Sequence, residues 1–480
     1  MKLRKLIPAW ALLISLLLAA CSGGGDIVSG SSLPLSSIEA FSEEFSSAET
    51  SSEISSVPPS SKAASSKKTS SKKPAASKNT SSAAPAQKVE AKKVENIEAP
   101  PSNSSKSEIA LPAYVTNTKY AALKPAEYYC YSTLVATHKT MYNVLRDAVA
   151  NMSEGCVLTG ASEYDLNYVY VAVMNDHPQF FWMSHSYVYG TFGTGMAIFF
   201  QYNADGMKVD YTCTRAQAAA RITAMNTEIT KIFAAMPAAL SEYDRELYFH
   251  DYLLDKNSYE FAAVASPESH LDAFSAYGAL ITGRIVCEGY SRGWQLLLYH
   301  SGINASLVVG HTNPDSQPHM WNMMKIDGKW YFSDLTWDDG AEMPYMYFNL
   351  RENDVASDHI HASAYGAFEF VSSFNFKLPN CNSLDANYYV VNGWWFGYDN
   401  QPQHETMTFT LIQQAALEGK RKIYIVMQDL DFYYNLKSYL KDSLDYDKLN
   451  EPITGYKISF SGLSIIEHDY GHPVRLEIKW

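Results

Sequence analysis

The stretch HMWNMMKIDGKWYFSD, residues 319–334, contains two runs of extended character joined by Asp327 and Gly328. Asp-Gly between alternating hydrophobic residues is the strongest short-range signal for a two-residue β-hairpin turn. With these turn residues, Ile326 pairs with Lys329, and this pairing sets the register of the whole hairpin. We therefore predict two antiparallel strands on either side of the turn.

The predicted register brings a histidine and a carboxylate together. Trp321 faces Asp334 across the hairpin, and because side chains alternate along a strand, His319 projects from the same face. His319 and Asp334 are then diagonal neighbours within reach of a hydrogen bond. A carboxylate in this position fixes the histidine tautomer and stabilises the imidazolium, which leaves the other ring nitrogen for a nucleophile. The hairpin alone thus predicts a general base with its orienting group.

A candidate nucleophile, Cys287, precedes a stretch with helical periodicity. Gly302 stands where this helix ends, and its apolar face is formed by Tyr290, Trp294, Leu297 and Leu298. The unpaired amides and the dipole at the start of a helix favour a negative group, and thus a thiolate, at Cys287. A single cysteine at a helix start is more often structural than reactive. The pattern by itself does not place Cys287 opposite His319.

Short motifs surround these three residues in a defined order. They are HDYL at 250–253, SAYGAL at 275–280, CEGYS at 287–291, Gly302-Ile303, HMWN at 319–322, DLTWDD at 334–339 and YMYF at 345–348. Over residues 238–362 this order resembles the bacterial transglutaminase-like superfamily. The departures are Met320, where alanine is usual, and Ser291, where alanine is frequent; neither belongs to the proposed triad.

The resemblance implies an α+β, papain-like core in which the cysteine lies on a helix packed against a sheet that carries the histidine and the aspartate. It assigns Cys287 as nucleophile, His319 as general base and Asp334 as the orienting residue. Acyl transfer through a thioester on Cys287 follows. The backbone N–H of Cys287 is the expected oxyanion donor. Tyr277 could support the oxyanion instead, but it is interpreted as a core tyrosine. We expect no cofactor and no metal.

The triad is compatible with two reactions and with one inactive alternative. Water as the second nucleophile makes the protein a peptidase or amidase, acting on peptide, protein or cell-wall amides. A lysine-type amine makes it a cross-linking transglutaminase. We predict hydrolysis and keep transfer as the alternative. The third possibility is a surface binding module that has lost activity, which the intact triad argues against; the oligomeric state stays open.

Neighbouring residues offer alternative assignments. His311 could replace His319 as the base, but it lacks a carboxylate at hairpin register. Trp321 and Trp337 are interpreted as packing that shields the ion pair from water. Asn322, on the opposite strand face, is interpreted as structural.

Two groups of polar residues raise the question of a metal. Asp338 and Asp339 are adjacent acids, but no ligand-rich loop of the kind that binds calcium accompanies them. Asp358, His359 and His361 are too few and too close together to predict a metal site.

The N-terminus predicts export. Three basic residues lie within the first five positions, residues 7–18 are almost entirely apolar, and small residues precede Cys21. This is the pattern of a secretory signal peptide, residues 1–20, and Cys21 resembles the lipidated cysteine of a bacterial lipobox. We expect an extracytoplasmic protein that is lipid-anchored to the bacterial cell membrane. The alternative is an ordinary signal peptide that contains a cysteine.

Residues 21–110 predict a disordered linker, because Ser, Ala, Pro, Lys and Glu dominate and too little apolar surface is present to offset chain ordering. We favour a solvated spacer over contact of its basic part, 62–93, with anionic lipid or wall polymer. Residues 1–21 contribute +3 and residues 22–110 are balanced, so the net charge of −13 leaves −16 on the remainder. That acidity excludes a typical nucleic-acid-binding protein.

The rest of the chain predicts three parts: an N-terminal α/β region at 111–237, the transglutaminase-like catalytic domain at 238–372 and a small α/β accessory domain at 380–480. The first part predicts strands at 168–173, 180–184 and 196–202, a helix at 214–235 and another that begins after Ser241. The last part predicts strands at 388–392, 422–427, 456–460, 463–467 and 475–479 and helices at 405–418 and 431–443. Five cysteines besides Cys21, an odd number, leave at least one free thiol.

Overall fold

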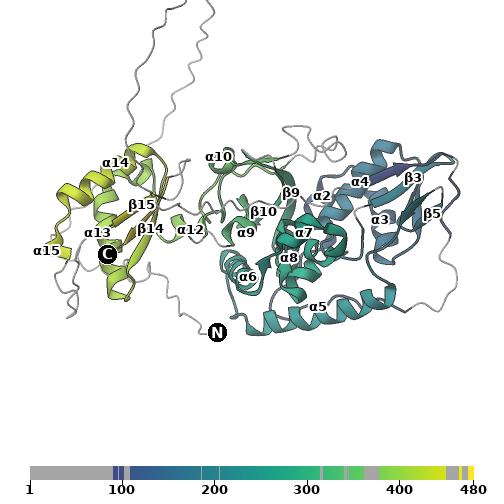
Figure 1. Ribbon diagram of the computed structural model, residues 1–480, viewed down its shortest axis with the longest axis horizontal. Coiled ribbons are helices and arrows are strands. Elements are labelled where there is room, and N and C mark those ends of the chain that lie inside the picture. Colours follow the sequence, from purple (N-terminus) through teal and green to yellow (C-terminus); the bar gives the residue numbers. More distant parts are fainter. Residues whose placement is uncertain are drawn as a thin grey trace, which may run out of the picture. The chain divides into compact units, whose positions relative to one another are not determined.

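The computed structural model of the chain (Figure 1) describes residues 90–95, 97–101, 109–184, 186–204, 206–313, 317–339, 343, 345–361, 378–449, 464–467 and 474–479. All of these belong to the unit formed by residues 82–480. The predicted signal peptide, Cys21 and the linker up to residue 89 lie outside the described residues and stay predictions. Among the helices that are described, none combines the length and the apolar character needed to cross a bilayer.

A four-stranded sheet forms the centre of the N-terminal region, in the order β1, β3, β4, β2. The strands are β1 (Glu90–Lys93), β3 (Ser186–Phe192), β4 (Gly195–Phe199) and β2 (Gly155–Leu158). Helices α3 (Ala136–Ala150) and α4 (Glu163–Asp176) pack against each other, and α3 also packs on β2. A small hairpin of β5 (Tyr202–Ala204) and β6 (Met207–Val209) follows.

Strand β1 corrects the predicted end of the disordered linker at residue 110. It pairs in parallel with β3, and Lys93 forms an ion pair with Glu163 at 2.6 Å. Val94 and Ile97, which follow the strand, pack into an apolar cluster of this sheet. Composition predicted disorder because few side chains are apolar, whereas the pairing depends on backbone groups that every residue carries.

Two predicted strands of this region have other structures. Residues 168–173 belong to α4, which begins with a capping box between Ser162 and Asp165. Most of this helix is buried, so its apolar run lacks a helical period and is indistinguishable from a buried strand in sequence. Residues 180–184 form turns, in which the indole N–H of Trp182 donates to the carbonyl of Val149 at 3.0 Å.

Two predicted helices are confirmed. Helix α5 (Arg215–Ala235) begins with Thr214 as N-cap, and α6 (Glu242–Lys256) begins with Ser241 as N-cap. Each cap side chain accepts a hydrogen bond from a backbone N–H of the first turn. Helix α6 packs directly against α8 (Cys287–His300), the helix that begins at the candidate nucleophile.

A second four-stranded sheet carries the candidate site, in the order β11, β10, β9, β12. Its strands are β11 (Lys329–Ser333), β10 (Pro318–Ile326), β9 (Asn304–Thr312) and β12 (His359–His361), and all their pairings are antiparallel. The predicted hairpin register is confirmed: Ile326 pairs with Lys329, and both turn residues have positive φ, 48° and 83°. Helix α8 packs on β9 and β10, and all of its residues are buried.

The C-terminal part contains a third sheet, in the order β13, β14, β16, β15. Its elements are β13 (Trp395–Phe396), β14 (Lys422–Met427), β15 (Ser464–Glu467), β16 (Val474–Lys479), α13 (His404–Leu417) and α14 (Leu430–Ser438). They confirm the predicted strands at 422–427, 463–467 and 475–479 and the predicted helices. The predicted strand at 456–460 lies outside the described residues.

The predicted strand at 388–392 is wrong, because it forms helix α12 (Tyr388–Val391). The side chain of Asn387 accepts hydrogen bonds from the backbone N–H groups of Tyr389 and Val390 and starts this helix. Shorter elements among the described residues include α2 (Tyr129–Thr133), β7 (Ser258–Tyr259), α7 (Phe261–Ala265), β8 (Arg284–Ile285), α9 (Leu335–Asp338), α10 (Glu352–Val355) and α15 (Tyr446–Leu449).

Candidate active site

Cys287 is the first residue of α8, where the sequence placed the helix start, and Val286 is its N-cap. The backbone N–H of Val286 donates to the carbonyl of Ala273 at 3.1 Å, which fixes the point at which the helix begins. The Cys287 side chain is fully buried and packs with Leu307 and Met320. The thiol therefore lies at the positive end of the helix dipole in apolar surroundings.

His319 lies on β10, and Asp334 follows β11 as the N-cap of α9. The distance from Nε2 of His319 to Oδ2 of Asp334 is 2.6 Å, so the two side chains are in the contact that the hairpin register predicted. The other carboxylate oxygen accepts two backbone N–H groups from the first turn of α9, at 2.9 and 3.3 Å. Asp334 is thus held at both oxygens, and its orientation toward His319 is fixed.

The absence of a side chain at Gly310 leaves room for the Trp321 ring and for strand β12. Gly310 on β9 lies directly opposite His319 in the ladder. A Cβ at this position would lie 2.3 Å from the ring of Trp321 and 2.3 Å from the carbonyl oxygen of Ile360 on β12. Any larger residue would therefore push either the ring beside His319 or the edge strand away.

The charges around His319 favour its protonated form. Burial lowers the pKa of His319, but the Asp334 charge, its hydrogen bond and the Cys287 thiol outweigh burial and raise the pKa to about 9. Burial raises the pKa of Asp334, yet the two histidines that bind it hold that pKa well below its usual range. Nδ1 of His319 is buried with no oxygen or nitrogen partner in the part of the chain described. It is the nitrogen left for the sulfur of Cys287, and the arrangement can hold a thiolate–imidazolium pair.

The three residues are closed off from solvent. The exposed fraction is 0% for Cys287 and His319 and 1% for Asp334. Charge interactions are stronger in such a site than at the surface, but the covering residues must move before a carbonyl group reaches the thiol. An open depression of about 380 Å³, lined by residues that include Arg221 and Arg284, contains none of the three.

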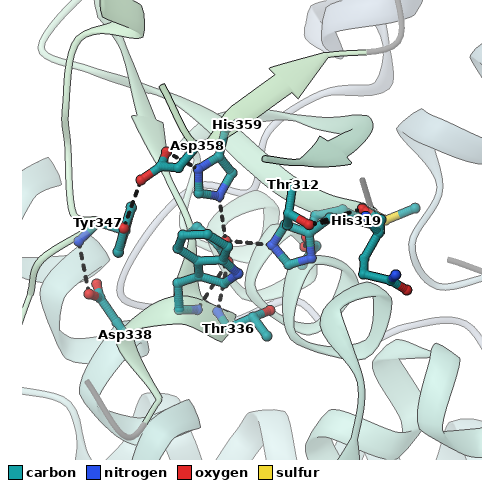
Figure 2. A network of polar contacts seen from close by, with 12 residues as sticks. Thr312, His319, Thr336, Asp338, Tyr347, Asp358 and His359 are labelled. Carbon is teal, nitrogen blue, oxygen red and sulfur yellow. Dashed lines mark hydrogen bonds and ion pairs between the residues drawn. The ribbon is translucent and has the colours of Figure 1, made fainter. Parts of the chain in front are cut away.

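A fourth side chain, His359, joins the site (Figure 2). Its Nε2 lies 3.0 Å from Oδ2 of Asp334, the oxygen that also binds His319, and its Nδ1 lies 2.6 Å from Oδ1 of Asp358. It reaches Asp334 because β12 pairs with β9. In the sequence, Asp358, His359 and His361 are candidates only for metal ligands; in the structure, His361 pairs with Glu352 at 3.2 Å. The adjacent residues Asp358 and His359 were the only sign of this role in the sequence. The contact of His359 with Asp334 depends on the long-range pairing of β12 with β9, which the sequence does not show.

His319, Asp334 and His359 also bring three possible metal-ligand atoms within 4.8 Å of one another. Both imidazoles point at the same carboxylate oxygen, at 2.6 and 3.0 Å. Hydrogen bonds from the two rings to one acceptor account for this convergence. We therefore treat the group as a hydrogen-bonded cluster.

The acids of the DLTWDD motif have partners within the protein. Asp338 lies 3.1 Å from Nε2 of His250 and accepts the backbone N–H of Tyr347 at 2.8 Å, and Asp339 accepts the hydroxyl of Tyr290. Burial lowers the pKa of His250, but its carboxylate neighbours raise it to about 9. The contact of His250 with Asp338 connects the HDYL motif on α6 to α9. These contacts account for both acids without calcium.

The alternative base, His311, points away from His319. It pairs with Pro318, the position before His319, and neighbouring positions on a strand project from opposite faces. Trp321 and Trp337 have ring centroids 5.9 and 6.0 Å from the His319 ring, which fits the predicted packing role.

The two remaining alternatives make structural contacts. Asn322 donates to the backbone carbonyl of Ser291 on α8 at 3.2 Å. Tyr277 packs under the guanidinium of Arg221 and beside Phe181, at 4.6 and 5.5 Å from its ring centroid. Both contacts favour the structural interpretations over chemical ones.

The other four described cysteines are, like Cys287, free of disulfides. Burial raises the pKa of each: to about 12 for Cys156 and Cys381, and upward for Cys130 and Cys213. A thiol with a raised pKa has little thiolate at neutral pH and reacts slowly.

Residues 232–335 match the family model of the transglutaminase-like superfamily. The matched segment contains Cys287, His319 and Asp334 within its bounds. The chain therefore carries a transglutaminase-like domain, a class whose members are generally enzymes of the cysteine-protease or acyltransferase type. Among proteins with curated descriptions, none matches the chain.

Three solved structures are similar to parts of the chain. A TGase is 14% identical, with 37% of this chain and 58% of that chain covered and a TM-score of 0.23. A provisionally assigned cysteine protease from Cytophaga hutchinsonii is 13% identical, with 35% and 54% covered and a TM-score of 0.21. A provisionally assigned protease from Parabacteroides distasonis is 8% identical, with 61% and 65% covered and a TM-score of 0.22. This chain thus spans less than two thirds of each.

Proposed function

We propose that this protein is an exported, membrane-anchored thiol enzyme that hydrolyses peptide or cell-wall amide bonds. The observation that carries the proposal is the contact of His319 with Asp334 at 2.6 Å. The Cys287 thiol interacts with the same imidazole and helps to raise its pKa. A nucleophile, a base and an orienting carboxylate in this order are the minimum that acyl transfer requires. The family match supports a peptide or protein substrate.

The reaction proceeds in two halves. The Cys287 thiolate attacks the amide carbonyl, the C–S bond forms, and the C–N bond breaks as the His319 imidazolium gives its proton to the leaving amine. Water then attacks the thioester while His319 takes one of its protons, and the carboxylic acid is released as the thiol is restored. The amides at the start of α8, including that of Cys287, are the expected donors to the oxyanion.

The second nucleophile and the location complete the proposal. Water is present at every turnover, whereas transfer requires that a second amine substrate reaches a buried thiol, and this favours hydrolysis over cross-linking. The lipobox-like Cys21 and the long spacer that follows it support action outside the membrane, within reach of wall peptides.

The test offers the purified chain a set of peptides and peptidoglycan stem peptides, with and without a primary amine, and follows the products by mass spectrometry. We expect amide cleavage that Cys287→Ala abolishes and that Cys156→Ala, on β2, leaves unchanged. An amine-coupled product would make the protein a transferase instead. Binding of substrate without any turnover would identify an inactive binding module and overturn the proposal.

A further inference from the structure

His359 lies between two carboxylates. Its Nε2 is 3.0 Å from Oδ2 of Asp334, and its Nδ1 is 2.6 Å from Oδ1 of Asp358. An ionised carboxylate only accepts hydrogen bonds, so a ring that bonds to carboxylates on both sides needs a proton on each nitrogen. The remaining oxygen of Asp358 accepts the hydroxyl of Tyr347 at 2.9 Å, which is the contact expected of an ionised group. The geometry thus describes a buried imidazolium.

The surroundings favour that charge. Titratable groups face His359 from several elements: His319 on β10, Asp334 at the start of α9, Tyr347 after α9, and Asp358 before β12. Aromatic rings also contact His359, with centroids at 4.4 Å for Trp337, 4.9 Å for Phe332 and 5.2 Å for Trp321. Ring faces attract a cation when water is excluded. Burial lowers the pKa of His359, but its two carboxylate partners outweigh burial and raise that pKa.

The contact with Asp334 is shared with the base. Oδ2 of Asp334 accepts from His319 and from His359, while Oδ1 accepts from the backbone of α9. The carboxylate is therefore saturated and cannot rotate away from His319. A positive charge on its far side also reduces the stabilisation that the Asp334 charge gives to the His319 imidazolium, which must give up its Nδ1 proton to the leaving amine.

We propose that His359, held as an imidazolium between Asp334 and Asp358, is a positioning residue that fixes the Asp334 carboxylate against His319 and partly neutralises its charge. This inference rests on the proposed function for its catalytic meaning, but its charge state and its effect on His319 are properties of the folded protein. The candidate site is then a hydrogen-bonded series of five side chains, from Cys287 through His319, Asp334 and His359 to Asp358.

Histidine NMR tests the charge state without any substrate. The full chain is labelled with ¹⁵N at histidine, and resonances are assigned by single substitutions. We expect His359 to show two protonated ring nitrogens at pH 7, above the pH at which an ordinary histidine loses its charge. A neutral His359 at pH 7 would overturn the proposal, whether or not the protein turns over an amide.

The variant His359→Gln tests the effect on His319. A glutamine amide keeps an N–H donor near Asp334 but carries no charge, so the Asp334 charge acts on His319 alone. We expect the titration midpoint of His319 to rise by roughly one pH unit, since the loss of a neighbouring like charge raises the pKa of a histidine by about that amount. In turnover, the alkaline limb of the pH profile should move upward by the same amount.

Two matched variants separate positioning from simple packing. His361→Gln alters the same strand two residues further on, at a side chain paired with Glu352, and should leave the His319 midpoint unchanged. Asp358→Asn removes the second carboxylate, so His359 should lose its charge at lower pH and the His319 midpoint should again rise. If His359→Gln lowers the melting temperature but leaves the His319 midpoint in place, His359 is only a packing residue. If all midpoints behave as expected but no amide is cleaved, the positioning stands and the proposed function fails.

Discussion

Replacing Asp334 by asparagine changes one oxygen to an NH₂ group and almost nothing in volume. In the native site, one oxygen accepts two backbone N–H groups of α9, and the other accepts from His319 and His359. Asparagine has only one acceptor oxygen. Backbone N–H groups cannot change their protonation, so we expect the amide oxygen to stay with them and the NH₂ group to face the imidazoles. His319 must then present a lone pair at Nε2, which moves its proton to Nδ1.

That change removes the base. Nδ1 is the nitrogen left for the sulfur of Cys287, and once protonated in a neutral ring it cannot accept the thiol proton. We expect kcat/KM to fall by about 10³ to 10⁴-fold, or roughly 4–5.5 kcal/mol of transition-state stabilisation. Solvent screening does not reduce this effect, because both side chains are at most 1% exposed.

The assay measures kcat/KM on any peptide that the wild type cleaves, the rate of Cys287 alkylation at about pH 6, and the His319 tautomer by ¹⁵N NMR. Asp339→Asn is the matched control, since it makes the same change in the same motif at a residue that binds Tyr290 and does not contact the triad. We expect Asp339→Asn to retain most of the activity. A folded Asp334→Asn protein with wild-type alkylation and turnover would refute the role of Asp334.

Three other predictions follow from the same observations. Iodoacetamide at about pH 6 should alkylate Cys287 at least tenfold faster than the other described cysteines, by peptide mass spectrometry, and equal rates would exclude an activated thiol. The pKa of His319 is raised to about 9 from an unfolded value near 6.5, so the stability it contributes is complete below about pH 6.5 and is lost as pH rises through 9. His250, with a pKa of about 9, acts in the same direction. The melting temperature should therefore fall between pH 7 and 9, and it should fall less in Asp334→Asn. A melting temperature that does not change with pH would contradict this. Cys21→Ser should abolish lipidation and either release the chain from the membrane or leave its precursor uncleaved. Deletion of residues 22–81 should not change the melting temperature. Deletion of residues 22–95 should lower the melting temperature, because it removes β1.

Sequence was sufficient where the interaction is local. The Asp-Gly turn determined the register of the β10–β11 hairpin, and that register alone brings His319 to Asp334. The helix start at Ser241 was predictable for the same reason, because its cap acts on a backbone N–H within one turn. The role of Cys287 opposite the hairpin came from the resemblance of the motif order.

Tertiary structure decided whatever depends on distant partners. The apolar run at 168–173 has no period in sequence, and only its burial on all sides makes it part of α4. Strand β1 forms because β3 offers an open edge, although its own residues are mostly charged. His359 joins the site because β12 pairs with β9 and sets its ring against Asp334. A sequence shows which groups can form hydrogen bonds. Which groups from distant parts of the chain meet is determined by the fold, because a contact that closes a long loop leaves no local sequence pattern.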